Sequence, residues 1–198
     1  MKKLFLFLLA GIYLQTAVAQ HTSTFAISYP ISFPMSDLKN YISKTSFRGI
    51  NFEWYKHIKQ NVAVGLETGW NVFYQKEDLK TYTEGTVSVS GVQYRYTNSV
   101  PILAALRYYK AEAKGKVVPY VGLGLGTVYV ERSTDFGVYR LTKDAWQFCL
   151  RPELGAMFQV YEGMDLMLGA KYYAGFNAND LNGQPYLSIN IGFAWHGY

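Results

Sequence analysis

The sequence contains almost no cysteine, and it has no apolar run long enough to cross a membrane as a helix. Cys149 is the only cysteine, so the chain cannot form an internal disulfide. The apolar run from Leu4 to Leu14 is shorter than the ~20 residues that a transmembrane helix needs. Beyond it we find no convincing helical periodicity. A disulfide-stapled scaffold and a helical membrane protein are therefore both excluded.

Charge and histidine are also scarce. Charged residues make up 17% of the chain, and the formal net charge is +5, of which Lys2 and Lys3 supply two units. This mild balance does not argue for nucleic acid as a partner. The three histidines, His21, His57 and His196, fall at predicted strand ends or in the N-terminal tail and have no cysteine partner. We therefore expect neither a zinc site nor another cofactor.

The first residues, MKKLFLFLLAGIYLQTAVAQ, have the features of a secretory signal. Two lysines precede the apolar run, and Ala17, Val18 and Ala19 form the small-x-small pattern that a signal peptidase cleaves. No cysteine stands at the cleavage point, so we do not expect a lipid anchor. We expect residues 1–19 to be a signal peptide and residues 20–198 to form one domain.

Aromatic residues and glycine are abundant: 18 Tyr, 12 Phe, 4 Trp and 18 Gly favour strands over helices. Period-two alternation predicts eight strands, each with one apolar face. Most are long enough for the ~9–11 residues with which a tilted strand crosses an outer membrane. The predicted strands cover residues 24–33, 46–57, 61–76, 99–110, 116–130, 145–160, 165–176 and 185–196.

The predicted connections alternate in length. Three are short, near residues 58–60, 111–115 and 161–164, and four are longer, at 34–45, 75–98, 131–144 and 177–184. Outer-membrane barrels have short periplasmic turns and long extracellular loops. The pattern therefore predicts an all-β fold, an eight-stranded antiparallel up-and-down transmembrane β-barrel after a cleaved signal peptide. The alternation continues over 86–97, which indicates that the longest loop is a hairpin above the membrane.

The face opposite the apolar one is rich in glycine and alanine and carries a few isolated charges. Glu67, for example, lies between Gly65 and Gly69. The interior of an eight-stranded barrel is just wide enough for side chains to fill it, and a buried carboxylate is tolerable only when it is paired. We predict a structural charge network in the lumen, with gating or a proton relay as the alternative. Its members are Glu53, Glu67, Arg107, Arg151, Glu153 and Lys171.

All four tryptophans fall on the apolar face. Trp54 and Trp195 lie toward the short-turn ends of their strands, and Trp70 and Trp146 lie toward the long-loop ends. Two rows of aromatic residues at the two interfaces are typical of membrane barrels. We therefore predict that these tryptophans belong to two aromatic girdles.

Small residues on the inward face have a simple explanation. Gly122, Gly124 and Gly126 share one face of a strand and do not match a phosphate-binding motif. We predict that they make room for inward tyrosines of neighbouring strands. Cys149 also faces inward and is expected to be a small filler of the interior.

The signal, the eight amphipathic strands, the short inner turns and the aromatic-rich last strand, PYLSINIGFAWHGY, together resemble the small outer-membrane β-barrel proteins. These include the OmpA transmembrane domain, OmpX and the OmpW-like or porin-family barrels. The resemblance implies residence in the cell outer membrane, contact with its lipids, and insertion by the barrel-assembly machinery. It departs at Gly197, where the alternation would place an aromatic residue. We expect a monomer.

Three functions remain open. The first is a non-enzymatic integral barrel whose lumen is plugged by side chains, with a structural role or with a role in surface binding through the four long connections. The second is a narrow OmpW-like channel for small apolar molecules. The third, a surface lipid hydrolase, needs a Ser-His-acid set near the outer rim. Because His57 and His196 are predicted at the opposite rim, we expect no enzyme.

Overall fold

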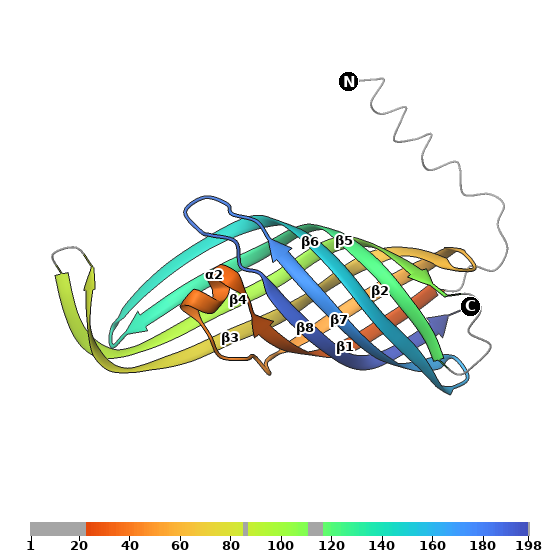
Figure 1. Ribbon diagram of the computed structural model, residues 1–198, viewed down its shortest axis with the longest axis horizontal. Coiled ribbons are helices and arrows are strands. Elements are labelled where there is room, and N and C mark those ends of the chain that lie inside the picture. Colours follow the sequence, from red (N-terminus) through yellow and green to blue (C-terminus); the bar gives the residue numbers. More distant parts are fainter. Residues whose placement is uncertain (1–22, 85–86, 111–116, 198) are drawn as a thin grey trace, which may run out of the picture.

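The computed structural model describes residues 23–84, 87–110 and 117–197, and within them eight antiparallel strands form a closed barrel (Figure 1). Each strand pairs with its neighbour in sequence, and β1 pairs with β8 to close the ring. The predicted all-β barrel with up-and-down order is thus confirmed. The strands are β1 (Ser23–Pro34), β2 (Gly49–Lys59), β3 (Val62–Glu84), β4 (Val87–Tyr109), β5 (Val117–Phe136), β6 (Tyr139–Tyr161), β7 (Met164–Gly175) and β8 (Tyr186–Gly197).

The alternation of side chains decides which face of each strand is outside. In β1, buried residues occupy every second position. Leu123 is 41% exposed on the outer wall, whereas Glu67 is 2% exposed in the interior. A water-soluble barrel would bury the leucine and expose the carboxylate. The barrel therefore turns its apolar face outward and its sparse charges inward, as the sequence predicts.

Four strands are much longer than the others. β3, β4, β5 and β6 have 20 to 23 residues, whereas the remaining strands have 11 or 12. Their extra length forms a sheet that extends beyond the barrel on the side away from the β6–β7 turn (Figure 1). We call residues 73–84, 87–98, 131–136 and 139–144 the projecting sheet.

The projecting sheet corrects one prediction and agrees with another. Strand β3 continues to Glu84 and strand β4 starts at Val87, so the two extend beyond the barrel as the alternation over 86–97 indicates. The segment 131–144, which we predicted to be a loop, is a hairpin in which β5 runs to Phe136 and β6 starts at Tyr139. The alternation is lost there because both faces of a strand outside the barrel are open to water, so neither face has to be apolar.

The connection 34–45 contains a short helix, α2 (Ser36–Tyr41), which the sequence pattern did not predict. With six residues it is too short to show an amphipathic period. Leu38, Tyr41 and Ile42 are buried and pack among lumen residues, so the helix covers the mouth of the barrel. No helix in the described ranges is long and apolar enough to span a membrane.

The β7–β8 connection also folds over the mouth. Leu181 is 3% exposed and packs in the same cluster as α2. The side-chain amide of Gln147, on β6, donates hydrogen bonds to the carbonyls of Leu181 and Asn182 over 3.4 and 2.9 Å. Two connections therefore meet above the lumen at the end that carries the projecting sheet.

Two hydrophobic clusters fill the lumen on either side of its charged residues. The mouth cluster contains Leu38, Tyr41, Ile42, Phe73, Leu103, Val128, Val130, Ala145, Cys149, Tyr173, Leu181 and Tyr186. The short-turn cluster contains Ala26, Tyr55, Ala63, Ala105, Tyr109, Tyr120, Met157, Met167 and Ala194. Cys149 is thus a buried filler of the mouth cluster.

Candidate functional site

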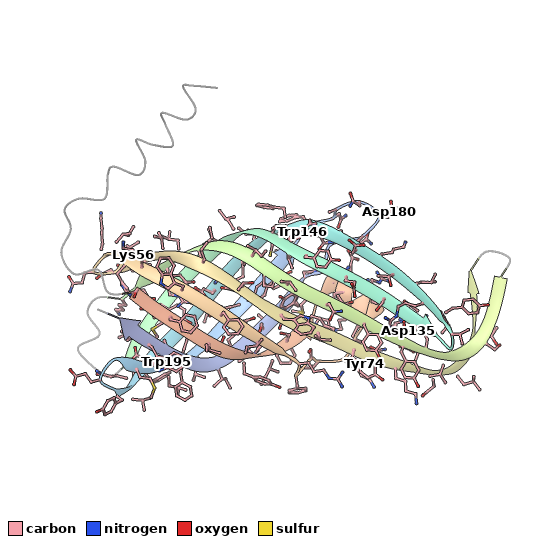
Figure 2. All side chains as sticks on the ribbon, turned by 180° about the vertical axis from the view of Figure 1, so that it is seen from behind. Lys56, Tyr74, Asp135, Trp146, Asp180 and Trp195 are labelled. Carbon is pink, nitrogen blue, oxygen red and sulfur yellow. The ribbon has the colours of Figure 1, made fainter. Side chains whose placement is uncertain are left out.

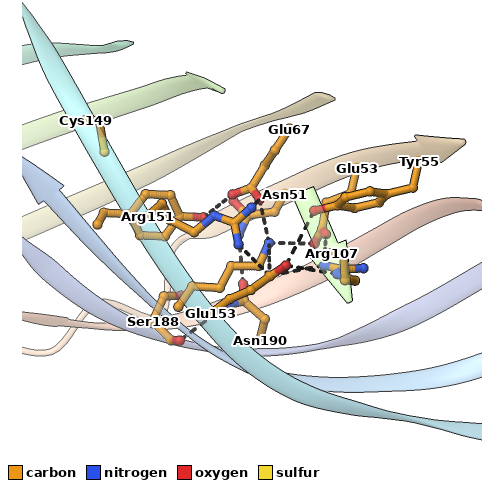
Figure 3. Close-up of polar contacts among 12 residues, drawn as sticks. Asn51, Glu53, Tyr55, Glu67, Arg107, Cys149, Arg151, Glu153, Ser188 and Asn190 are labelled. Atoms are coloured by element: carbon orange, nitrogen blue, oxygen red, sulfur yellow. Dashed lines mark hydrogen bonds and ion pairs between the residues drawn. The ribbon is translucent and has the colours of Figure 1, made fainter. Parts of the chain in front are cut away.

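The six charged residues predicted for the lumen form one buried group (Figure 3). They come from five strands, and none is more than 6% exposed. Each occupies an inward position of its strand, so the barrel geometry brings them together. Because water is excluded there, each charge has to be neutralised by protein groups. The members are Glu53 on β2, Glu67 on β3, Arg107 on β4, Arg151 and Glu153 on β6, and Lys171 on β7.

Lys171 bridges two carboxylates that would otherwise repel each other. Glu53 and Glu67 are directly opposed across the β2–β3 ladder, and like charges at opposed positions are destabilising. The ammonium of Lys171 lies 2.6 Å from Oε1 of Glu53 and 3.0 Å from Oε2 of Glu67. β7 thus supplies a cation that reduces the repulsion built into the register of these two strands.

The two arginines link the acids of β2 and β3 to Glu153 on β6. Arg107 Nη2 donates to Glu53 over 2.6 Å, and its Nε donates to Glu153 over 2.9 Å. Arg151 lies 2.6 Å from Glu67 and 2.6 Å from Glu153. The Arg151 contacts are ion pairs by distance, but its N–H groups are not aligned with the oxygens as hydrogen bonds. Three acids and three bases thus balance in one closed network.

The three glutamates are close enough to share a cation, because one carboxylate oxygen of each lies within 4.8 Å of the others. The positive charge at this place comes from Lys171, whose Nζ is also 4.0 Å from Glu153. The arrangement therefore satisfies the carboxylates with protein groups alone.

Three tyrosines that the sequence reasoning did not name complete the network. The guanidinium of Arg107 lies between the rings of Tyr55 and Tyr120, 4.1 and 4.2 Å from their centroids. Tyr173 donates its hydroxyl hydrogen to Glu67 over 2.5 Å. Their inward positions in the alternation were a usable signal, but the partner of each depends on register across the barrel.

Two of the three β5 glycines make room for charged side chains and the third for a backbone carbonyl, and not for tyrosines as we predicted. A Cβ on Gly122 would lie 2.4 Å from Oε1 of Glu153, and one on Gly124 would lie 3.0 Å from Nε of Arg151. A Cβ on Gly126 would meet the backbone carbonyl oxygen of Ile102 at 2.3 Å. Because Gly122 and Gly124 have no side chains, Glu153 and Arg151 of β6 can pack directly against the backbone of β5 in the narrow lumen.

The four tryptophans lie on the outer wall with 40–57% of their surface exposed. Trp195 lies near the short-turn end, and Trp146 lies farther toward the mouth (Figure 2). Trp195 stacks on Phe25, with ring centroids 6.3 Å apart, and Trp146 packs on Tyr129 at 5.2 Å. Trp54 and Trp70 are likewise outward, on β2 and β3. All four rings thus face outward, as members of the two predicted girdles would, and the assignment to girdles stays a prediction.

A second polar group, which sequence reasoning missed, closes the short-turn end. Nε2 of His196 lies 3.0 Å from Asp165, and its Nδ1 lies 3.0 Å from the hydroxyl of Thr24. Nε2 of His57 lies 3.4 Å from the same hydroxyl. An acid, an imidazole and a hydroxyl in line resemble a catalytic triad, but Thr24 is 0% exposed. A nucleophile without access to substrate cannot act, so this group ties β1, β2, β7 and β8 together.

Comparison with known proteins identifies the family. A family model described as the outer membrane protein beta-barrel domain matches residues 4–196. No curated protein matches the chain significantly.

Solved structures of small outer-membrane barrels have the same fold. Ail of Yersinia pestis, in complex with the heparin analogue sucrose octasulfate, has 13% identity and a TM-score of 0.55 over 90% of this chain and 99% of that one. Neisserial surface protein A has 15% identity and a TM-score of 0.54, over 88% of this chain and 96% of that one. OprG of Pseudomonas aeruginosa has 14% identity and a TM-score of 0.52, over 91% of this chain and 97% of that one. With the family match, these folds show that the chain belongs to the outer membrane protein beta-barrel domain family and resides in the cell outer membrane.

Proposed function

We propose that the protein is a non-enzymatic barrel with a closed lumen, which holds the projecting sheet at the cell surface for binding to an extracellular partner. The observation that supports closure is the continuous side-chain packing along the lumen. A balanced ion network lies between two hydrophobic clusters, and α2 covers the mouth. A filled lumen does not explain why four strands extend beyond the barrel. Binding at the cell surface gives these extensions a role.

The orientation supports the same role. In outer-membrane barrels the short turns face the periplasm and the long connections face outward. The projecting sheet lies on the side opposite the β6–β7 turn, which joins Tyr161 to Met164. It therefore stands above the outer leaflet, with four strands holding it to a rigid base.

Planar-bilayer conductance of the purified protein tests closure. We expect no stable unit conductance for the wild type or for Glu131→Ala, a control acid on the projecting sheet. Stable unit conductance in the wild type that changes in Glu67→Ala but not in Glu131→Ala would show an open pathway through the ion network. That result would overturn the proposed closed lumen.

A lateral conduit for small apolar molecules is the second candidate. The observation that favours it is a groove of about 400 Å³ on the outer wall, lined by apolar side chains and by parts of Glu53 and Glu67. The other lining residues are Phe25, Phe52, Trp54, Leu66, Thr68, Ile102 and Leu103. Uptake of a small apolar dye into proteoliposomes, compared for wild type and Ile102→Trp, tests it. Equal uptake by protein-free liposomes would exclude the conduit.

A further inference from the structure

Three cations lie side by side on the inner face of the projecting sheet, the face that continues the lumen wall. Arg95 is on β4, Arg132 on β5 and Lys143 on β6. Arg132 is directly opposed to Lys143, and Arg95 is two residues from Thr97, the partner of Arg132 on β4. Neighbouring strands lie about 4.8 Å apart, so the three positions form one row that runs obliquely across the sheet.

The nearest acid on the same face is Glu77 of β3, which is directly opposed to Gln93 and accepts a hydrogen bond from the side chain of Gln75. Glu131 and Asp144 are also directly opposed, but they are adjacent in sequence to Arg132 and Lys143 and thus point to the other side. Among the side chains that the structure describes, none of the three cations has a carboxylate within ion-pair distance. Opposed like charges destabilise a sheet. An anion bound between them would remove that cost.

The mouth helix holds the two arginines in place. The guanidinium carbon of Arg132 lies 3.4 Å from the centroid of the Tyr41 ring, and that of Arg95 lies 5.1 Å from it. Arg95 Nη1 donates to the Tyr41 carbonyl over 3.0 Å, and the Tyr41 hydroxyl donates to the Ser133 carbonyl over 2.8 Å. Both arginines stay partly exposed. Their orientation is therefore fixed before any ligand arrives, which lowers the entropic cost of binding.

We propose that Arg95, Arg132 and Lys143 bind the sulfate or phosphate groups of an anionic polysaccharide. This rests on the proposed surface-binding role and names its ligand class. Guanidinium groups bind such oxyanions bidentately, and a row of three cations suits repeated charges better than a single ion. The inner face is turned toward the mouth of the barrel and away from the lipid that surrounds the outer wall. A polysaccharide can reach it, whereas a membrane headgroup cannot.

Binding of the full-length protein in nanodiscs to dextran sulfate, with uncharged dextran as reference, tests the site. We expect Arg132→Gln/Lys143→Gln to weaken binding about tenfold or more, because two charge-assisted contacts are lost. Arg140→Gln is the matched control. Arg140 is exposed, lies on the other face of β6 and pairs with Asp135. The Arg140→Gln variant should bind dextran sulfate with an affinity within about twofold of the wild type, because the change removes no contact in the row.

Two results would overturn the site. One is unchanged affinity in the double variant, and the other is an equal loss in Arg140→Gln, which would indicate attraction by overall charge only. A loss of association with phosphatidylglycerol vesicles without loss of dextran sulfate binding would assign the cations to lipid and also reject the proposal. Heat-modifiable gel mobility shows whether each variant is folded. A failure of the polysaccharide-binding site would not alter the bilayer conductance expected for a closed lumen. The conductance measurement therefore tests the closed lumen independently of this site.

Discussion

Tyr173 donates a hydrogen bond of 2.5 Å to Glu67, and this contact joins the charged layer of the lumen to the mouth cluster. Tyr173 is 1% exposed and stacks on Tyr186 with ring centroids 4.5 Å apart. A buried carboxylate that loses a donor keeps its full desolvation cost. We expect Tyr173→Phe to lower the free energy of unfolding by about 1.5–3 kcal/mol, the usual worth of a hydrogen bond to a charged group.

Tyr172→Phe is the control for that change. Tyr172 points to the outer wall and is 36% exposed, so the same loss of one hydroxyl should change stability by less than about 0.5 kcal/mol. Urea unfolding of both variants in lipid vesicles provides the measurement. Equal losses in the two variants would mean that the hydroxyl of Tyr173 contributes nothing specific to Glu67.

Lys171 is the cation whose removal should be most harmful, because it alone lies within 4.0 Å of all three glutamates among the described cations. Lys171→Met leaves three buried carboxylates with two arginines, and breaking a buried network in this way costs about 3–5 kcal/mol. Adding Glu67→Gln restores the charge balance and should recover part of the loss. Lys59→Met, at an exposed position, is the control. If the double variant is no more stable than Lys171→Met by urea unfolding, charge balance is not the reason for the network.

Gly122 should not tolerate a side chain. A Cβ there would lie 2.4 Å from Glu153 Oε1 and 2.9 Å from the Leu106 carbonyl oxygen. Because the carboxylate is held by two arginines, we expect Gly122→Ala to cost about 1–3 kcal/mol, as overpacking in a filled interior does. Gly91→Ala, where nothing lies within 4 Å of the added Cβ, is the comparison in the same unfolding assay. A cost at Gly122 no larger than at Gly91 would show that Glu153 can move aside.

Asp135 on the projecting sheet should titrate at an unusually low pH. Two hydrogen bonds of 2.7 Å from Arg140 lower the pKa of its carboxyl below the ordinary value. A lowered folded-state pKa stabilises the hairpin above the unfolded pKa, and this contribution is lost as the pH falls through the folded value. NMR titration should show the Asp135 pKa rising toward about 3.9 in Arg140→Gln. An unchanged midpoint would mean that the pair is not formed in solution.

Most of the barrel could be predicted from the sequence because one periodicity carries the information. A strand residue such as Glu67 can point only to the lumen or to the lipid. Because its neighbours in sequence, Leu66 and Thr68, belong to the apolar face that meets lipid, Glu67 must point to the lumen. The segment 131–144 lacks that contrast. Both faces of its strands are wet, so its hairpin resembled a loop. The helix α2 was not predicted because its buried residues pack over the mouth of the barrel, and a segment of six residues is too short to show a helical period.

The candidate sites were predictable in composition but not in connectivity. Alternation assigns Glu53 and Lys171 to the lumen, yet their contact depends on the stagger of strands far apart in sequence. The link from Asp165 through His196 to Thr24 likewise requires the first and last strands to be paired. The cationic row depends on the same register, because Arg132 and Lys143 are opposed only when β5 and β6 form a hairpin.

The outer wall of the barrel provides the final test, because its energetics depend on lipid. Leu123 on β5 is 41% exposed on that wall, and Leu141 on β6 is 62% exposed on the projecting sheet. An arginine near the bilayer midplane costs about 2–4 kcal/mol, whereas one above the membrane is solvated by water. We expect Leu123→Arg to lower the free energy of unfolding in lipid vesicles by this amount and Leu141→Arg to leave it nearly unchanged. Equal stability of the two variants would mean that the apolar wall around Leu123 does not contact acyl chains.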